Sequence, residues 1–277
     1  MNLTLGADPE LFIKSGDSFV SAHSFVLGTK RAPLPVLGGA VQHDGTAAEF
    51  NIDPASSADE FLGNIRGVMR LLTEMIEGVA IANDLPEVTL LATPIAVFSQ
   101  KHFDSLPAEV KELGCDPDFN AWDDLAENPK PRVDFPMRTG GGHVHIGWRE
   151  PEPVDDAHKN ECAELVKQLD AILFPMSHLW DDNDLRRRSY GTMGAYRPKE
   201  FGVEYRPLSN AWVGDDDLVK WIFNATVMAD EALASGEKYH QTNEFADFLC
   251  GPSREQALHY HEVLVDDGFP SLPEKYL

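Results

Sequence analysis

Pairs of ionisable side chains stand two residues apart in three segments of the chain. They are Asp8 and Glu10 in GADPELF, His143 and His145 in GGGHVHIGW, and Glu204 and Arg206 in GVEYRPL. Residues i and i+2 of a strand share one face, so the members of each pair can face a common site. Carboxylate and imidazole groups bind divalent cations, and guanidinium groups bind phosphate or carboxylate. Together the pairs predict a metal and phosphate site on one face of a sheet.

Each pair also has a plain structural interpretation. The first fits a turn that enters a strand, the second a pair of surface histidines, and the third a cross-strand ion pair. These alternatives stay open for any single pair, and it is their joint occurrence that favours a site. The neighbouring positions Val144, Ile146, Val203 and Tyr205 are apolar or aromatic. The opposite face of this sheet is therefore expected to pack against helices.

A fourth segment, GGAVQHDGTAAEFNIDP, adds His43, Asp44 and Glu49 near a strand that follows two glycines. Glu49 lies beside Phe50 and Ile52, so its carboxylate would flank apolar packing. We interpret Glu49 as a further site residue, with a solvated glutamate as the alternative.

The segment RRRSYGTMGAYRPKE is the dense basic run of the sequence, with Arg186, Arg187, Arg188 and Arg197. Clustered cations beside glycines in so acidic a chain indicate capture of an anion. The alternative is a helix C-terminus, where cations complement the helix dipole and the acidic residues that precede the run.

The composition limits the classes of partner. The 277 residues include 46 acidic and 23 basic side chains, a formal charge of −23. Such a surface repels nucleic-acid backbones and anionic lipid, so neither is an expected partner. ATP is an anion too, and a site for it needs metal ions and local arginines. No apolar stretch is long enough to cross a membrane, and the N-terminus shows no signal peptide. The three cysteines, Cys115, Cys162 and Cys250, form no disulfide or zinc pattern. A reduced cytoplasmic location is expected.

Apolar periodicity and turn residues predict the elements that would position these side chains. Extended segments are predicted over residues 1–13, 17–27, 41–52, 88–98, 143–148 and 201–208. Helices are predicted from Ser56 or Ser57, from Asp155 or Asp156 to a bend or end at Pro175, from Asp215 to about Ala234, and from Ser253. Clustered strands separated by long helices predict an α+β fold with a mainly antiparallel, curved sheet covered by helices on one face. We expect one catalytic domain over 1–277, with an irregular insertion at about 100–136 and a helical C-terminal extension at about 236–277.

The order of these motifs resembles the glutamine synthetase and glutamate–cysteine ligase superfamily, and more closely the phage COOH.NH2 ligase type 2 group. The resemblance covers about residues 3–235. Members open with a G-x-E-x-E strand, and GADPE matches it with Asp8 in place of the first Glu and Pro9 between the acids. The glycine-rich turn into an H-V-H strand and the later E-x-R strand follow in the same order. The metal ligands that the resemblance implies are Asp8, Glu10, Glu49, His143 and Glu204.

The resemblance also implies an activity and its participants. A ligase of this class phosphorylates a carboxylate with ATP, and an amine then attacks the acyl phosphate. Mg²⁺, with Mn²⁺ as the alternative, and ATP are the implied cofactor and co-substrate. The implied partners are a carboxylate donor and an amine acceptor, and relatives often assemble into homo-oligomers. The implied nucleotide-binding residues are His145, Arg186, Arg187, Arg188 and Arg197. The implied catalytic residues are Glu49, Arg197 and Arg206, with Arg206 binding a substrate carboxylate.

Three other functions remain open. A guanidino kinase would use the same fold to phosphorylate a guanidine without ligation. A cupin-type metal enzyme is favoured by the H-x-H-x4-E spacing of His143, His145 and Glu150. A non-enzymatic phage binding module would keep the fold alone, and the Asp8 departure favours it.

Overall fold

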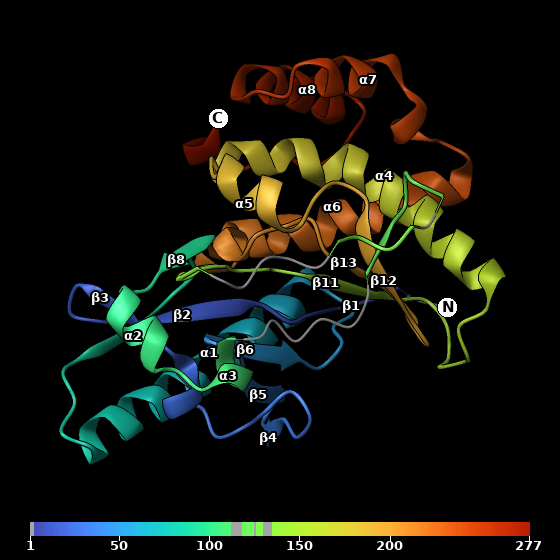
Figure 1. The fold of residues 1–277 in the computed structure, drawn as a ribbon. Coiled ribbons are helices and arrows are strands. Elements are labelled where there is room, and N and C mark those ends of the chain that lie inside the picture. Colours follow the sequence, from blue (N-terminus) through green and yellow to red (C-terminus); the bar gives the residue numbers. More distant parts are fainter. Residues whose placement is uncertain (1–2, 112–117, 125, 130–134) are drawn as a thin grey trace.

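Antiparallel sheets and long helices make up the fold (Figure 1). It is seen in a computed structural model that describes residues 3–111, 118–124, 126–129 and 135–277. All pairings between named strands in these ranges are antiparallel. The α+β class with antiparallel strands is therefore confirmed. The strands do not form one sheet, however, but two main sheets and a small two-stranded one.

The first main sheet holds the histidine strand as its second strand, beside the central strand that carries Glu204. Its order is β1 (Thr4–Ala7), β11 (Val144–Gly147), β13 (Gly202–Tyr205), β12 (Ala195–Lys199) and β9 (Phe119–Asn120). His145 pairs with Gly6 on one side and with Glu204 on the other, and Glu204 in turn pairs with Arg197. This register places three of the predicted site residues in one row across the sheet.

The second main sheet carries the remaining acids. Its order is β3 (Ser18–Val20), β2 (Glu10–Ser15), β6 (Ala47–Ile52), β5 (Gly39–Asp44) and β4 (Leu34–Val36), with β7 (Val88–Leu91) also paired to β2. Glu49 lies opposite Glu10 on one side and Gln42 on the other. The small sheet joins β8 (Ile95–Val97) to β10 (Met137–Thr139).

Four predicted strands are interrupted, and the first of them, residues 1–13, breaks at Asp8-Pro9. Residues 41–52 form a β-hairpin, because the chain turns at Gly45, whose φ is 55°. Residues 17–27 contain only β3 and a short 3-10 helix, η1 (Ala22–Ser24). Residues 88–98 divide into β7 and β8, which pair with different strands.

The chain passes from one main sheet to the other at Asp8-Pro9. β1 ends at Ala7 and pairs with β11, whereas β2 begins at Glu10 and pairs with β6. Pro9 has no N–H to donate to a ladder, which favours the break at this position. Asp8 and Glu10 therefore do not share the face of one strand, as the i and i+2 spacing predicts. Asp8 faces the first sheet and Glu10 the second.

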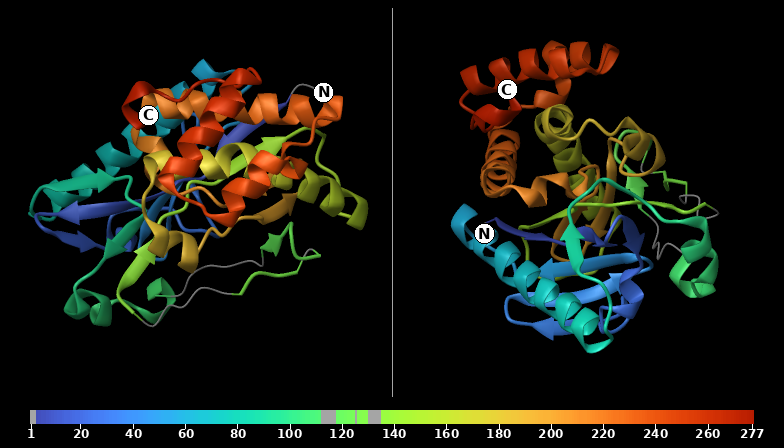
Figure 2. Two further views of the ribbon diagram at one scale, coloured as in Figure 1. Left: turned by 90° about the horizontal axis from the view of Figure 1, so that it is seen from above. Right: turned by 90° about the vertical axis from the view of Figure 1, so that its left-hand side faces the viewer.

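Three long helices cover the sheets. They are α1 (Ala58–Ala82), α4 (Asp156–Trp180) and α6 (Asp216–Ser235), and the side chains of Ser57, Asp155 and Asp215 cap their N-termini. α1 packs on β5, β6 and β7, α4 packs on β12 and β13, and α6 contacts both helices. Figure 2 shows α1 running along the second sheet. α4 continues past Pro175, and burial of Met176 and Leu179 stabilises this last turn.

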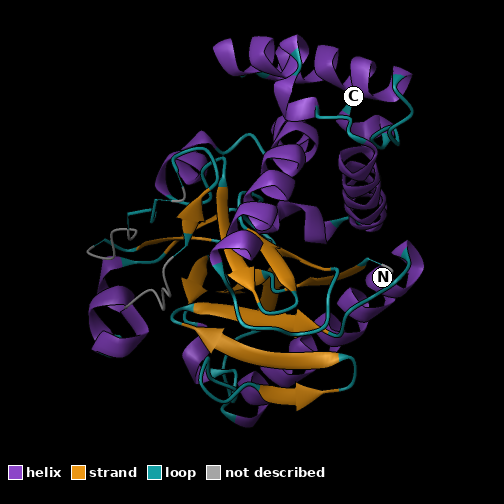
Figure 3. Ribbon diagram, turned by 90° about the vertical axis from the view of Figure 1, so that its right-hand side faces the viewer, coloured by secondary structure: helices purple, strands orange, loops and turns teal. Residues whose placement is uncertain are grey.

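Shorter helices complete the chain. They are α2 (Gln100–Ser105), α3 (Ala108–Lys111), α5 (Asp184–Ser189), α7 (Asn243–Cys250) and α8 (Arg254–Asp266), with 3-10 turns η2 (Asn210–Gly214), η3 (Tyr239–Gln241) and η4 (Glu274–Tyr276). α8 packs on α4, and Figures 1 and 3 show α7 and α8 beyond the long helices, away from the strands. None of the helices in the described ranges is long and apolar enough to cross a membrane.

The main hydrophobic core runs through both sheets and into the C-terminal helices. It includes Leu5 of β1, Phe50 of β6, Leu169 of α4 and Phe248 of α7. A second, smaller core joins Phe12 to side chains of α2 and α3. The division into a domain, an insertion and an extension stays a prediction. Cys162 and Cys250 are free thiols, and Cys115 lies outside the described residues.

Asp170 is a buried carboxyl group between α4 and the first sheet. Trp122 Nε1 donates to its Oδ2 at 2.7 Å, and the Tyr205 hydroxyl donates to its Oδ1 at 2.9 Å. No cation takes part in these contacts, so burial dominates and raises the pKa of Asp170 from 3.8 to about 7.

The raised pKa of Asp170 predicts a pH-dependent stability. Between pH 4 and 7, roughly, the folded protein holds a proton that the unfolded chain releases. The Asp170 contribution to the free energy of unfolding should therefore fall by on the order of a few kcal/mol as the pH rises through this range. Asp170→Asn removes the charge, and Tyr205 can turn its hydroxyl to accept from the amide. Urea denaturation of both proteins from pH 5 to pH 8 measures this. The free energy of unfolding of Asp170→Asn should rise relative to that of the wild type as the pH rises. A constant difference would contradict this prediction.

Candidate active site

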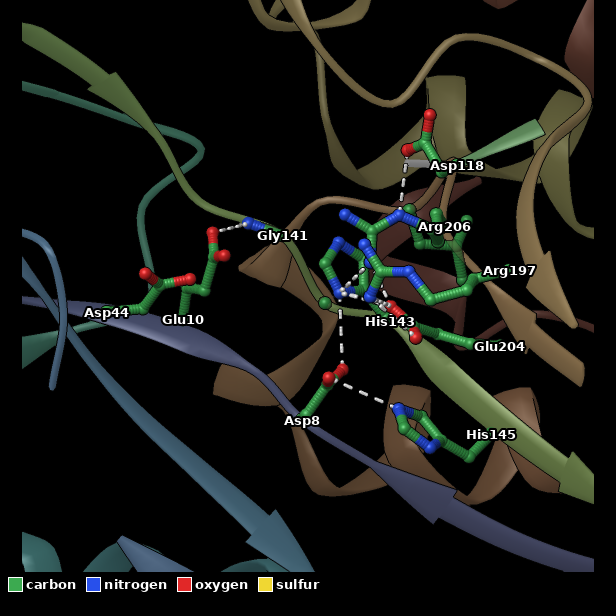
Figure 4. A network of polar contacts seen from close by, with 12 residues as sticks. Asp8, Glu10, Asp44, Asp118, Gly141, His143, His145, Arg197, Glu204 and Arg206 are labelled. Carbon is green, nitrogen blue, oxygen red and sulfur yellow. Dashed lines mark hydrogen bonds and ion pairs between the residues drawn. The ribbon is translucent and has the colours of Figure 1, made fainter. Parts of the chain in front are cut away.

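A cavity of about 680 Å³ opens where the two main sheets meet. Seven of the predicted site residues line it: Asp8, Glu10, Glu49, His143, His145, Arg197 and Arg206. Glu204 lies behind this lining, fully buried and in contact with four of the side chains that line the cavity. Residues up to 198 positions apart in the chain, from Asp8 to Arg206, thus converge as predicted (Figure 4).

The first sheet supplies one candidate cation-binding group, formed by Asp8, His143 and Glu204. One ligand atom from each lies within 4.8 Å of the others. His143 Nδ1 is 3.2 Å from Asp8 Oδ1 and 3.6 Å from Glu204 Oε1. Asp8 also faces the second histidine, with His145 Nε2 3.2 Å from its Oδ2. Figure 4 shows the Asp8 carboxylate pointing toward both imidazoles.

The second sheet supplies another group, formed by Glu10, Asp44 and Glu49, whose ligand atoms also lie within 4.8 Å of one another. The Gly141 N–H donates to Glu10 Oε2 at 2.8 Å, and Lys30 Nζ lies 2.9 Å from Asp44 Oδ2. Asp44 lies in a segment that the sequence singles out, but it is not among the ligands predicted from the sequence. Its place at the end of β5, beside the hairpin turn, brings it to Glu10 and Glu49.

The crowding of carboxylates in the second group shifts their pKa values. Burial, then the charge of Asp44, raises the pKa of Glu10 to about 7. Burial, then Asp8 and Asp44, raises the pKa of Glu49 well above its usual value. Glu49 Oε2 is buried and has no hydrogen-bond partner among the described residues. A divalent cation would neutralise this charge and coordinate the free oxygen, so the donor set fits Mg²⁺ or Mn²⁺.

The ionisation of the first group is set by its histidines and by Arg206. Burial alone would raise the pKa of Asp8, but His145 and His143 hold it well below the usual range. Burial and then Arg206 lower the pKa of His143 to about 4. Burial opposes protonation of His145, yet Asp8 raises the pKa of that imidazole. His143 is therefore neutral near pH 7 and has a lone pair to offer a metal.

Glu204 is held by three cations. Arg206 Nη1 donates to its Oε1, Lys199 Nζ lies 2.6 Å from its Oε2, and Arg197 Nη1 lies 3.1 Å from the same oxygen. Burial would raise the pKa of Glu204, but Arg206 and the other cations hold it far below the usual range. In the absence of a metal these cations compensate the buried charge.

Arg206 is bound by protein side chains on several sides. Besides Glu204, its Nε donates to Asp118 Oδ2 at 2.9 Å, and its Nη2 donates to the Tyr190 hydroxyl. Asp118 comes from within the predicted 100–136 insertion and is not among the predicted site residues. A substrate carboxylate could use only the guanidinium donors that these contacts leave free.

Only Arg197 of the basic run lines the cavity; Arg186, Arg187 and Arg188 do not, and their nucleotide-binding role stays a prediction. The Arg186 guanidinium is buried and donates to the carbonyl oxygens of Pro207 and Leu208. Arg187 donates to the carbonyl oxygens of Ser177 and Asp181, and Arg188 is exposed. Arg186 and Arg187 thus donate hydrogen bonds to carbonyl oxygens near the ends of β13 and α4. This arrangement is similar to the alternative in which the run lies at a helix C-terminus. The basic side chains that line the cavity are Lys30, Arg149, Arg197, Lys199 and Arg206.

The third ligand of the cupin alternative is also misplaced. Glu150 lies in an exposed loop after β11 and does not line the cavity that holds His143 and His145. Long helices and two open antiparallel sheets likewise differ from a small β-barrel.

The fold and the cavity define an α+β protein whose two sheets enclose a pocket of carboxylates, imidazoles and guanidinium groups. Residues 132–251 match the family model described as phage phiEco32-like COOH.NH2 ligase-type 2. This match confirms the resemblance inferred from the sequence over the matched segment, which is less than half of the chain. It includes His143, Glu204 and Arg206, and it does not extend to Asp8, Glu10 or Glu49.

Comparisons with whole proteins give weaker likenesses. No curated protein matches the chain in sequence. Among solved structures, the chain is similar to one described as a novel glutamine synthase homolog, at 14% identity and a TM-score of 0.40, covering 97% of this chain and 68% of that one. Another is the complex between Prokaryotic Ubiquitin-like Protein Pup and its ligase PafA, at 10% identity and a TM-score of 0.40, covering 99% of this chain and 60% of the matched one.

Proposed function

We propose that this protein is an ATP-dependent and divalent-metal-dependent carboxylate–amine ligase that forms an amide or peptide bond through an acyl phosphate. The observation that carries the proposal is the pair of three-ligand groups, one from each sheet, that meet at a single cavity. Two such groups beside several cationic side chains suit phosphoryl transfer, in which metal ions and cations compensate phosphate charge.

The proposal assigns roles by place in the cavity. Asp8, His143 and Glu204 would hold one cation, and Glu10, Asp44 and Glu49 would hold a second. When bound, Mg²⁺ or Mn²⁺ would neutralise the negative charge of the ATP phosphates. Arg197, Lys199 and His145 lie on the same wall and can stabilise an anionic ligand there. Glu49 and Arg206 stay in the proposed catalytic group, and the arginines at 186–188 are given no contact with the nucleotide.

The proposal is tested by a substrate screen that reads phosphate release and product mass together. Purified protein with ATP and Mg²⁺ should release phosphate when a carboxylate and an amine are both supplied, and the product should have the mass of their condensation. Phosphorylation of a guanidine without condensation would instead indicate a guanidino kinase. Bound iron without nucleotide binding would indicate a cupin-type enzyme. Failure to bind both Mg²⁺ and ATP would indicate a binding module.

Two arginines from the same basic segment distinguish the sequence-based assignment from the structural one. Arg197→Ala removes a guanidinium group from the cavity wall, so nucleotide turnover should fall at least about 100-fold. Arg188→Ala changes an exposed side chain outside the cavity and should leave turnover unchanged. Steady-state kinetics with saturating Mg²⁺ measures both. A loss of turnover in Arg188→Ala would restore the nucleotide-binding role predicted for the run.

A further inference from the structure

Tyr190 lines the cavity and was not among the residues that the sequence singled out. Its hydroxyl lies between two site residues. Arg206 Nη2 donates to it, and His143 Nε2 is 3.4 Å away. The ring centres of Tyr190 and His143 are 6.0 Å apart, and the Arg206 guanidinium carbon lies 5.5 Å from the Tyr190 ring centre. Tyr190 therefore contacts both a proposed metal ligand and the cation that holds another.

The local backbone fixes Tyr190 in this place. Tyr190 follows the last residue of α5, and the chain turns at Gly191, whose φ is 70°. A Cβ atom on Gly191 would lie 2.6 Å from the Arg186 guanidinium, so Arg186 packs directly against this turn. The Arg186 guanidinium carbon is also 5.9 Å from the Tyr190 ring centre. Arg186 thus supports the tyrosine and does not reach a ligand itself.

The two nitrogens of His143 face different partners. Nδ1 faces the carboxylate oxygens of Asp8 and Glu204, and Nε2 faces the Tyr190 hydroxyl. A neutral imidazole carries one proton, on one nitrogen or the other. Arg206 Nη1 lies 3.5 Å from Nδ1, but the Asp8 carboxylate is closer, at 3.2 Å, so without a cation the proton is favoured on Nδ1, and Nε2 then accepts from Tyr190. With a cation between Asp8, His143 and Glu204, Nδ1 must offer its lone pair, so the proton has to be on Nε2.

We propose that Tyr190 is a positioning residue that stabilises the metal-binding tautomer of His143 by accepting a hydrogen bond from its Nε2–H. The inference rests on the proposed metal site. The phenolic oxygen has two lone pairs, one for Arg206 and one for His143, so it can accept from both at once. The change of tautomer is balanced, since one proton leaves Nδ1 and one is taken up at Nε2. Partners of this kind, behind a metal-binding histidine, fix ring orientation and tautomer.

The test compares Tyr190→Phe with Tyr196→Phe. Tyr196 belongs to the same segment and is buried, but its hydroxyl donates to the Lys159 carbonyl at 3.3 Å and it does not line the cavity. Mn²⁺ affinity is measured without nucleotide, from the electron paramagnetic resonance signal of free Mn²⁺. The Mn²⁺ site under test is the one that His143→Gln abolishes. Tyr190→Phe should weaken Mn²⁺ binding at this site by about 10–100-fold, and Tyr196→Phe should leave that affinity unchanged.

A second measurement reads the tautomer directly in the wild type. Histidine labelled with ¹⁵N gives ring signals that distinguish Nδ1–H from Nε2–H, and His143→Gln identifies the signal of residue 143. Adding Mg²⁺ should convert His143 from the Nδ1–H to the Nε2–H form. An Nδ1–H form in the Mg²⁺-loaded protein would overturn the inference, even if Tyr190→Phe failed to fold.

The outcomes separate this inference from the proposed function. Wild-type protein that binds neither Mn²⁺ nor Mg²⁺ would overturn both. Wild-type protein that binds Mn²⁺ through His143, with equal affinity in Tyr190→Phe, would overturn the role of Tyr190 and leave the proposed function in place. Weaker binding in Tyr190→Phe alone, together with the Nε2–H form in the loaded wild type, supports the inference.

Discussion

Replacing Glu204 with Gln should lower the free energy of unfolding by about 3–5 kcal/mol, because it removes the acidic partner of a buried ion pair. Glu204 is fully buried and compensates Arg206, with Lys199 and Arg197 close to the same carboxylate. The neutral amide leaves the Arg206 guanidinium buried beside weaker acceptors. Urea denaturation of the metal-free protein at pH 7 measures the change.

Glu200→Gln is the matched control for this prediction. Glu200 is exposed in the turn between β12 and β13, four residues before Glu204. A substitution at such a surface site usually changes the free energy of unfolding by no more than about 0.5 kcal/mol. Equal stability of the Glu204→Gln and Glu200→Gln variants would show that the three cations do not depend on the buried carboxylate.

Replacing Glu10 with Gln should not destabilise the fold, unlike Glu204→Gln, and its main effect should be a large loss of activity. In the metal-free protein Glu10, Asp44 and Glu49 repel one another, so neutralising Glu10 should leave the free energy of unfolding unchanged or raise it. The amide oxygen can still accept the N–H of Gly141. Loss of a charged ligand should lower Mg²⁺-dependent ATP turnover by more than the roughly 100-fold typical of residues behind the ligands.

Asp17→Asn serves as the control for Glu10→Gln, since Asp17 is an exposed acid in the turn that follows β2. Turnover and thermal unfolding are measured on the same preparations. Full turnover in Glu10→Gln would remove Glu10 from the proposed metal site. Unfolding of that variant would mean that the carboxylate charge stabilises the fold, against the repulsion inferred here.

The sequence predicted the fold class and the residues that converge, because both follow from local patterns. Helical periodicity and capping residues located α1, α4 and α6. Alternation of polar and apolar residues around His143 and Glu204 indicated strands with one polar face. The interpretation of 41–52 as a single strand was wrong, although Asp44-Gly45 is a dipeptide typical of hairpin turns. That dipeptide could have placed Asp44 at the end of a strand that pairs with the strand of Glu49.

Other parts of the site could not be predicted from local patterns. Lys30, Tyr190 and Asp118 are single residues in irregular segments, and only tertiary packing brings Lys30 and Tyr190 to the cavity and Asp118 to Arg206. The places of Arg186, Arg187 and Arg188 could not be predicted, because a dense cluster of charge does not specify where each side chain points. Arg186 and Arg187 instead donate hydrogen bonds to main-chain carbonyl oxygens near the ends of β13 and α4.

The passage of the chain from one sheet to the other at Pro9 has a consequence for ligand size. Asp8 and Glu10 flank this residue, and each belongs to the three-ligand group of its own sheet. The proline ring fixes φ, so this junction is a stiff spacer. The separation of two cations would then depend on the angle between the sheets and not on rotamers within either group. A fixed separation of the two cations would favour a polyphosphate whose length matches it.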